Sequence, residues 1–298
     1  MNQTKFNQIV KDFETIPEIY NLLIWQNNTT FQHHFKDNPT KMDVRSISKV
    51  VLTIITGMVD GLNENTYIYP IIKDHIHLKN KANLKYLKQI QIKHCLTHTV
   101  GFDTVLLMRQ DIENVDHKSL LNYVINTPLA HKPGTHYLYS NAGHYLLSAT
   151  LQHFLKQDLI TYMDIHFFKP LNIVDYKWEK YGDYCAGATR LWLYPEDLLK
   201  IGQILLNPST PYLSQAWLNF MKSITTITAQ HHNQNKTFIR YAYGHGIWVN
   251  NKNLYFGHGT DGQTLIIDPD KNAILITLSK QKDMTKLEEI IDKTLKLL

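Results

Sequence analysis

Segments in which apolar and polar residues alternate, as in β-strands, lie at both ends of this sequence. Segments with helical periodicity lie between them. Residues 20–35, YNLLIWQNNTTFQHHF, predict two strands around an Asn27–Asn28 turn. After about residue 240, four apolar segments separated by turn residues predict a meander, and residues 283–298 predict a closing helix with one apolar side. The simplest arrangement is one antiparallel sheet built from both termini, with terminal helices and a mostly helical region inserted between its strands.

We therefore predict an α+β fold. Residues 1–45 and 181–298 are expected to form an α/β part that contains the sheet, and residues 46–180 a mainly helical part. An apolar helix is expected to start at Ser46. Residues 194–207, YPEDLLKIGQILLN, predict an amphipathic helix with a proline near its start.

Composition and charge narrow the functional classes. The formal charge of +5 is mild and spread along the chain, so the densest basic segment, residues 73–94, is interpreted as a solvated face and no nucleic-acid partner is expected. No stretch reaches the ~18 apolar residues of a membrane span, and the polar N-terminus has no signal region. The two cysteines, Cys95 and Cys185, predict no disulfide framework. These features indicate a cytoplasmic protein and leave its oligomeric state open.

The stretch YFGHGTDGQTLIID contains Gly257-x-Gly259-x-x-Gly262, which matches the dinucleotide fingerprint. That fingerprint works only where the glycines follow a strand and open a helix whose N-terminal amides hold a pyrophosphate. Here the last glycine runs into a β-rich segment, so we expect no cofactor. The glycines are expected instead to let the strand edge approach a substrate in a cleft.

Ser46-x-x-Lys49 is a candidate nucleophile and base. Residues three apart on a helix share a face, a desolvated lysine can act as a base, and a serine at a helix N-terminus lies where backbone amides favour negative charge. The alternative role of Ser46 is an ordinary helix N-cap. A second match, Ser279-x-x-Lys282, falls at the end of a predicted strand and is interpreted as fortuitous.

Tyr139-x-Asn141 is a second candidate element. A tyrosine hydroxyl can relay a proton, and an asparagine amide can hold a substrate carbonyl. The alternative is a packed tyrosine at a loop-to-helix junction with Asn141 as a cap.

The sixteen histidines do not show metal-ligand spacing, and we expect no metal site. His94 and His98 have helical i,i+4 spacing without the glutamate of HExxH. The other histidines considered lie in isolated pairs: His33 and His34, His75 and His77, and His231 and His232.

Together, these motifs resemble the serine β-lactamase and penicillin-binding-protein superfamily, in its class C-like branch with DD-peptidases and esterases. Ser46-x-x-Lys49, Tyr139-x-Asn141 and His258-Gly259-Thr260 stand in the order of its SxxK, YxN and KTG-type elements. LTHTVGF and PGTHYLYSNAGHYLL are similar to its LLTHTSGL and PGxxxxYSNxGYxLL stretches. The resemblance covers about residues 40–280.

The resemblance implies acyl transfer through a covalent serine ester, with the active site in the cleft between the two parts of the chain. Ser46 would attack a carbonyl, Lys49 and Tyr139 would share the proton transfers, and Asn141 would position the substrate. The oxyanion would lie between the backbone N–H of Ser46 and one near Asp261. Water would then hydrolyse the acyl-enzyme.

The third motif departs from the family pattern. His258 replaces the usual lysine, and a neutral imidazole holds a carboxylate less strongly. Thr260 stands where glycine is expected, and Asp261 adds a negative charge. We expect these residues and Gly259 to bind substrate, which the resemblance limits to a small ester, a D-amino-acid amide or peptide, or a β-lactam-like molecule. The alternative is a catalytically weak module that binds or senses a peptide or wall fragment.

Overall fold

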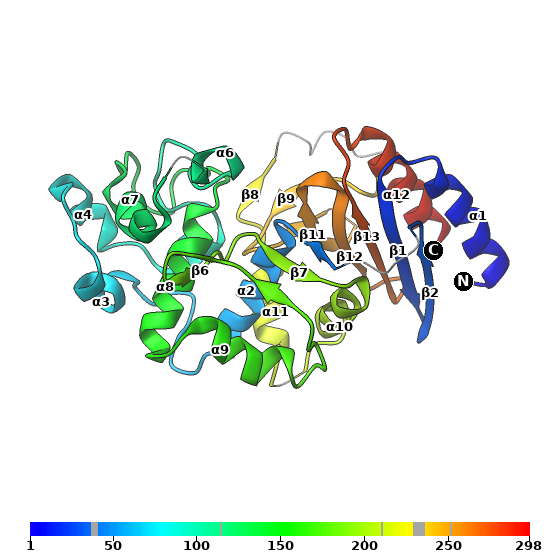
Figure 1. The fold of residues 1–298 in the computed structure, drawn as a ribbon, viewed down its shortest axis with the longest axis horizontal. Helices are drawn as coiled ribbons and strands as arrows, with labels where there is room; N and C mark the ends of the chain where they lie inside the picture. Colours follow the sequence, from blue (N-terminus) through cyan, green and yellow to red (C-terminus); the bar gives the residue numbers. More distant parts are fainter. Residues whose placement is uncertain (37–40, 114, 210, 229–235, 251) are drawn as a thin grey trace. The chain divides into compact units, whose positions relative to one another are not determined.

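The structure is a computed structural model that describes residues 1–36, 41–113, 115–209, 211–228, 236–250 and 252–298 (Figure 1). The chain forms two compact units. Unit 1 comprises Met1–Val51, Asp175–Lys177 and Leu191–Leu298, and unit 2 comprises Leu52–Val174 and Trp178–Arg190.

The chain passes from unit 1 to unit 2 within helix α2, Ile47–Met58. Ser46 and Lys49 therefore belong to unit 1, whereas Tyr139 and Asn141 belong to unit 2. The boundaries expected from the sequence, at residues 46 and 180, stay a prediction.

Unit 1 contains the sheet expected from the sequence, with strands from both termini side by side. Eight strands pair in the order β2-β1-β13-β12-β11-β10-β9-β8, and the described pairs are antiparallel. The N-terminal Ile24 pairs with Leu275 near the C-terminus. The strands are β1 Ile19–Gln26, β2 Thr29–His34, β8 Thr226–Ile227, β9 Ala242–Tyr243, β10 Trp248–Val249, β11 Tyr255–Gly259, β12 Gln263–Asp268 and β13 Ala273–Ser279.

Two turns of the sheet show how far the local sequence determines it. Asn27 and Asn28 both have positive φ, 50° and 62°, as a two-residue hairpin turn requires, so the predicted β1–β2 hairpin is confirmed. In contrast, the first of the four apolar segments predicted after residue 240, residues 241–250, was expected to form one strand. They form β9 and β10 instead, because Gly244 N donates to Ile247 O at 2.9 Å and reverses the chain.

Helices cover both faces of the sheet in unit 1. On one face, the terminal helices α1 and α12 share an apolar cluster with Ile266 and Leu275. On the other face, Gly202 of α10 packs on Leu265 and Ile274, the alternating neighbours of those residues. The terminal helices and the amphipathic helix α10 were all expected from the sequence. The helices are α1 Gln3–Glu14, α10 Pro195–Leu206, α11 Gln215–Lys222 and α12 Thr285–Leu297.

Unit 2 is mainly helical and is organised around α8, Ala142–Leu155. Every residue of α8 from Ala142 to Leu151 is buried, as expected for a helix surrounded by α3, α5, α7, α9 and strand β6. The helices and turns are α3 Tyr69–Ile72, α4 Leu84–Leu87, α5 Ile92–Leu96, α6 Arg109–Ile112, α7 Leu120–Asn126, α9 Leu159–Met163, η1 Lys73–His75, η2 Lys81–Asn83, η3 His117–Ser119 and the π-helical η4 Asp164–Phe168.

Short strands complete the two units. The β5–β6 hairpin belongs to unit 2, and β3 pairs with β7 in unit 1. Their bounds are β3 Met42–Asp43, β4 Lys177–Trp178, β5 Lys180–Tyr181, β6 Tyr184–Cys185 and β7 Leu191–Leu193. Among the described residues, none of the helices has the length and apolar character needed to cross a bilayer. The cytoplasmic location stays a prediction.

Candidate active site

Ser46 lies in the tight connection between strand β3 and helix α2. Arg45 has a φ of 54°, which turns the chain sharply before the helix begins at Ile47. Its backbone N–H donates to Asp43 Oδ1 at 2.9 Å, and its carbonyl accepts from Ser48 Oγ at 2.6 Å. These bonds fix the serine directly before the first turn of α2, where the sequence placed it.

Lys49 is buried beside Ser46 in unit 1. Its Nζ donates to Ser46 Oγ at 3.0 Å, and only 1% of its surface is exposed. Burial disfavours the charged ammonium and lowers the pKa of Lys49 from 10.5 to about 7. A lysine with that pKa has a substantial neutral fraction at neutral pH, and a neutral amine can accept the proton of a serine hydroxyl.

Arg45 connects the serine turn to the third motif, a contact that the sequence reasoning missed. Its Nη1 lies 2.7 Å from Asp43 Oδ2, and its Nη2 and Nε lie 2.8 Å and 3.0 Å from Asp261 Oδ2. The carboxylate of Asp261, expected as a charge beside a cleft, is thus directed at Arg45. The position of Arg45 directly before SxxK was the signal available in the sequence.

The three glycines of the GxGxxG pattern have three different structural reasons. A Cβ on Gly259 would lie 2.7 Å from Arg45 Cβ and 2.8 Å from Val44 O. A Cβ on Gly257 would meet the side chains of Val50 and Ile47 at 3.1 and 3.2 Å. Gly257 and Gly259 therefore let β11 pack closely on the serine turn and on α2. The expectation that these glycines admit a substrate stays a prediction.

Gly262 instead closes the turn between β11 and β12. Its φ of +93° suits glycine, and a Cβ there would lie 2.0 Å from Ser279 Oγ. The prediction that the pattern runs into a strand rather than a helix is confirmed, since Gln263 begins β12. Thr260 lies exposed in this turn, η6 Thr260–Gly262, and its expected role in substrate binding stays a prediction.

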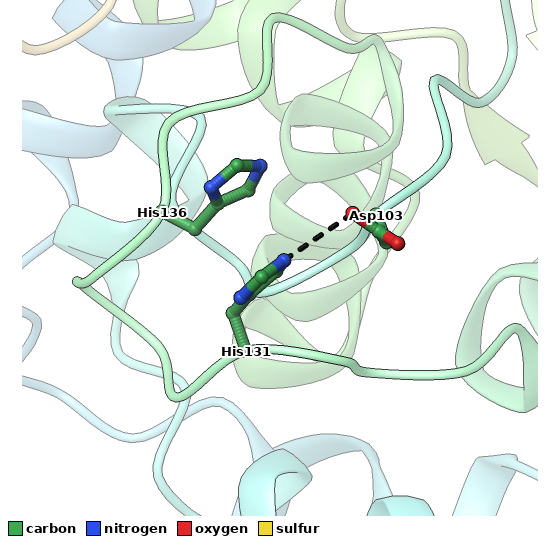
Figure 2. Close-up of side chains that lie close together, drawn as sticks. All are labelled: Asp103, His131 and His136. Atoms are coloured by element: carbon green, nitrogen blue, oxygen red, sulfur yellow. Dashed lines mark hydrogen bonds and ion pairs between the residues drawn. The ribbon is translucent and has the colours of Figure 1, made fainter.

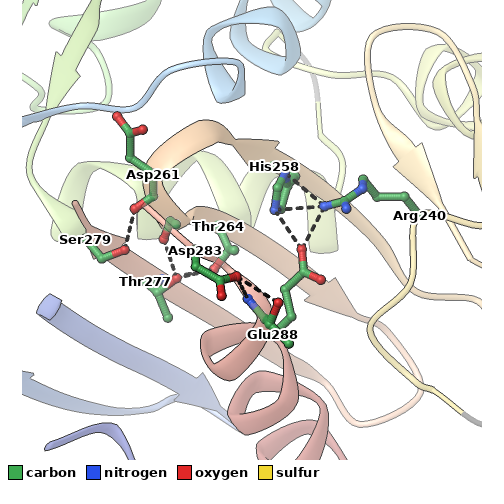
Figure 3. A network of polar contacts seen from close by, with 10 residues as sticks. Arg240, His258, Asp261, Thr264, Thr277, Ser279, Asp283 and Glu288 are labelled. Atoms are coloured by element: carbon green, nitrogen blue, oxygen red, sulfur yellow. Dashed lines mark hydrogen bonds and ion pairs between the residues drawn. The ribbon is translucent and has the colours of Figure 1, made fainter. Parts of the chain in front are cut away.

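Buried hydroxyl groups hold this turn in place (Figure 3). Ser279 Oγ donates to Asp261 O at 2.6 Å, and Thr277 Oγ1 donates to Gly262 O at 2.9 Å. Thr264 Oγ1 lies 2.7 Å from Thr277 Oγ1. Because such bonds are costly to break in a dry environment, they hold the backbone of the turn that carries Asp261.

His258 lies in a charged cluster with Arg240 and Glu288, two residues that sequence reasoning did not single out (Figure 3). Arg240 Nη1 lies 3.1 Å from His258 Nε2 and donates to Glu288 Oε1 at 2.9 Å. Burial, and then the positive charge of Arg240, lower the pKa of His258 from 6.5 to about 3. His258 is therefore neutral near pH 7, and the positive charge at this position belongs to Arg240.

In unit 2, Tyr139 and Asn141 of the second motif both contact neighbouring residues of that unit. The ring of Tyr139 packs on His98, with centroids 4.2 Å apart. Asn141 is 8% exposed, and its Nδ2 donates to Leu107 O at 2.7 Å. Asn141 stands at the N-cap position of α8, as the alternative interpretation had it, but its side chain makes no capping bond there.

A small pocket lies beside this motif in unit 2 and has room for about one water molecule. It is too small for an acyl substrate, so it is not a candidate substrate site. It is lined by His98, Val100, Gly101, Phe102, Leu138, Ser140 and Gly143.

His94 and His98 each accept a hydrogen bond from a backbone N–H. His94 Nδ1 accepts from Gln91 N at 3.1 Å in a capping box of α5, and burial lowers its pKa to about 4. His98 Nδ1 accepts from Ser140 N at 3.3 Å. His231 and His232 lie outside the described residues.

A family comparison agrees with this geometry. The family model described as Beta-lactamase matches residues 24–295, which is most of the chain. The chain therefore belongs to the beta-lactamase family, and the resemblance and the fold class inferred from the sequence are confirmed.

Individual relatives are distant. Protein flp of Staphylococcus aureus (strain MW2) is 25% identical over 275 residues, covering 80% of this chain and 53% of that protein, so the chain spans about half the length of this relative. The beta-lactamase/D-alanine carboxypeptidase from Yersinia pestis superposes with a TM-score of 0.74 at 14% identity and covers 99% of both chains. The D-amino acid amidase from Ochrobactrum anthropi superposes with a TM-score of 0.73 at 15% identity, covering 98% of this chain and 97% of that one. At these identities the likeness shows the fold alone.

Proposed function

We propose that this protein is a serine hydrolase that works through a covalent acyl-enzyme on a small ester, a D-amino-acid amide or peptide, or a β-lactam-like molecule. The observation that carries the proposal is the Ser46–Lys49 pair, with Oγ and Nζ 3.0 Å apart and a lysine whose pKa is lowered to about 7. Membership of the beta-lactamase family supports the same chemistry.

In the proposed reaction, neutral Lys49 accepts the proton of Ser46 as Oγ forms a bond to the substrate carbonyl. The backbone N–H of Ser46 and one near Asp261 stabilise the oxyanion that develops. The leaving group departs with a proton, which Lys49 or Tyr139 supplies. Water then attacks the ester on Ser46, releases the acid and restores the hydroxyl.

The charges of unit 1 favour an acyl donor without a carboxylate. His258 is neutral near pH 7, and the guanidinium of Arg240 already contacts Glu288. Arg45 likewise contacts both Asp43 and Asp261. An anionic substrate would have to compete with these carboxylates, so we rank esters and amides that lack a carboxylate above β-lactams, which carry one.

A turnover panel tests the proposal. The purified protein would be given p-nitrophenyl esters of short acids, D-alanyl amides and a chromogenic β-lactam, with Ser46→Ala as the blank. We expect turnover of an ester or D-amino-acid amide that disappears in Ser46→Ala, with slower turnover of the β-lactam. Turnover that Ser46→Ala retains would contradict the assignment of the nucleophile.

A binding module of the same fold is the second candidate, and one observation favours it. Asn141 Nδ2, which the family resemblance assigns to positioning the substrate, already uses one of its two N–H donors on Leu107 O. Saturable binding of a peptide or wall fragment, with no covalent intermediate and no turnover on any substrate of the panel, would support this second function.

A further inference from the structure

We propose that Asp103, His131 and His136 in unit 2 form a binding site for a first-row divalent transition-metal ion, with Zn²⁺ as the ion to test. One potential ligand atom from each residue lies within 4.8 Å of the others. His131 Nε2 lies 3.3 Å from Asp103 Oδ1, and the two imidazole rings stack with centroids 4.0 Å apart and planes at 24° (Figure 2). The proposal does not depend on the proposed hydrolase activity.

Backbone contacts bring the two segments of this site together without help from a ligand. Phe102 forms an isolated antiparallel bridge with Leu129. His131 N donates to Gly101 O at 3.0 Å, a close approach that needs glycine, because a Cβ on Gly101 would lie 2.3 Å from His131 O. The loop that separates the histidines is therefore fixed on the segment that carries Asp103.

A tight turn then directs His136 back toward His131. Gly134 has a φ of +88°, and its N–H donates to Thr99 O at 2.8 Å. Thr135 closes the turn by donating to Lys132 O from both its N–H and its Oγ1, at 3.1 and 2.7 Å. The positions of the two histidines thus follow from the backbone of the loop.

The donor set selects a class of ion. Two imidazole nitrogens and one carboxylate oxygen suit Zn²⁺, Cu²⁺ or Ni²⁺, whereas Mg²⁺ and Ca²⁺ prefer sites built from oxygen alone. Tetrahedral Zn²⁺ with bonds of about 2.0–2.1 Å places its ligand atoms roughly 3.3 Å apart. The side chains need to close by about 1.5 Å at most, which side-chain rotation permits because Asp103 and His131 are 69% and 36% exposed.

Three protein ligands leave a coordination position for water or another small ligand. The loop of His131 and His136 leads within three residues to Tyr139 of the second motif. A bound ion would link this loop to the Asp103 segment and stabilise the folded state of unit 2. We therefore expect ion binding to be visible as a gain in thermal stability, independently of any activity.

The experiment uses the full chain, freed of affinity tag and metal by cleavage and chelator dialysis. ZnCl₂ is titrated by calorimetry, and the melting temperature is measured with and without Zn²⁺. We expect one ion per chain and a higher melting temperature. His131→Gln, His136→Gln and Asp103→Asn should each weaken binding by about 10-fold or more.

His75→Gln serves as the matched control, because the ring of His75 stacks on His153 in the same unit, with centroids 3.6 Å apart, outside the proposed group. This variant should bind Zn²⁺ as tightly as the wild type. The absence of saturable binding, or equal affinity in the wild type and in His136→Gln, would overturn the proposal.

Discussion

The environment of Lys49 differs from that of an ordinary, solvent-exposed lysine. Its ammonium would be buried, and the lowered pKa of about 7 follows from that burial. We expect the acylation rate of Ser46 to rise as pH increases through about 7 and to level off above it, because only the neutral amine accepts the serine proton. The rate of modification by a fluorophosphonate, measured from pH 5 to pH 9, gives this profile.

The variant Lys49→Ala should lose this rise, and its acylation rate should fall by about two to four powers of ten, as for loss of a general base. Lys282→Ala is the matched control, since this exposed lysine belongs to the second SxxK match and should leave both rate and profile unchanged. A wild-type pH profile in Lys49→Ala would remove Lys49 from the mechanism.

The guanidinium of Arg45 forms ion pairs with the carboxylates of Asp43 and Asp261. The Asp43 side chain is only 4% exposed. Arg45→Ala would remove the guanidinium that contacts this buried carboxylate, so the free energy of unfolding should fall by about 3 kcal/mol. Denaturation by urea measures the change. Lys36→Ala, which removes an exposed ion pair with Glu18, should cost about 1 kcal/mol or less. Equal losses in the two variants would contradict a structural role for Arg45.

At the scale of elements, the packing of β11 on the serine turn is the contact that positions the nucleophile. Gly259→Ala would press a methyl group against Val44 O and the Arg45 side chain. We expect it to slow acylation and to cost about 1–3 kcal/mol of stability, as overpacking does. Stopped-flow acylation and urea denaturation measure both effects.

Gly257→Ala is the matched control on the same strand, because the atoms nearest to its methyl group would belong to the side chains of Ile47 and Val50, which can adjust. It should lose less stability and retain more acylation than Gly259→Ala. If Gly259→Ala instead weakened substrate binding with no loss of stability, the glycine would serve substrate approach, as the sequence alone suggested.

The elements that the sequence predicted well are those whose pattern is local. The Asn27–Asn28 hairpin, the amphipathic α10 and the apolar side of α12 depend on alternation or periodicity within a single segment. The split between β9 and β10 escaped prediction, because a glycine-rich turn lies inside a run with strand character. The Ser46–Lys49 contact was predictable for the same reason, since helical spacing alone brings the two side chains together.

Contacts between distant segments could not be predicted. Arg45 contacts Asp261, and Arg240 contacts His258 and Glu288, through the tertiary arrangement of segments that lie far apart in the sequence. The group of Asp103, His131 and His136 has no motif spacing, so a search for metal-ligand patterns passed over it. Topology, and not residue type, brings these side chains together.

At the scale of the whole molecule, His258, whose side chain is 12% exposed, makes the free energy of unfolding depend on pH. An unfolded histidine binds a proton below about pH 6.5, whereas His258 in the folded protein does so only near its lowered pKa of about 3. Between these values the unfolded state binds more protons, so stability falls as pH falls, by up to about 1.4 kcal/mol per pH unit from this group.

His258→Asn should therefore flatten the loss of stability between about pH 6 and pH 4, as measured by urea denaturation at a series of pH values. His258→Gln provides a second variant with a neutral, polar side chain and should behave alike. A slope in both variants equal to that of the wild type would show that His258 is not buried in its neutral form.

The central claim is that Ser46 is the nucleophile, and intact-mass spectrometry after treatment with a fluorophosphonate at pH 8 tests it most directly. Our account predicts one adduct per chain on the peptide that contains Ser46, its loss in Ser46→Ala, and its retention in Ser48→Ala, whose hydroxyl donates to Arg45 O. An adduct that persists in Ser46→Ala, or that maps to another residue in the wild type, would contradict the account.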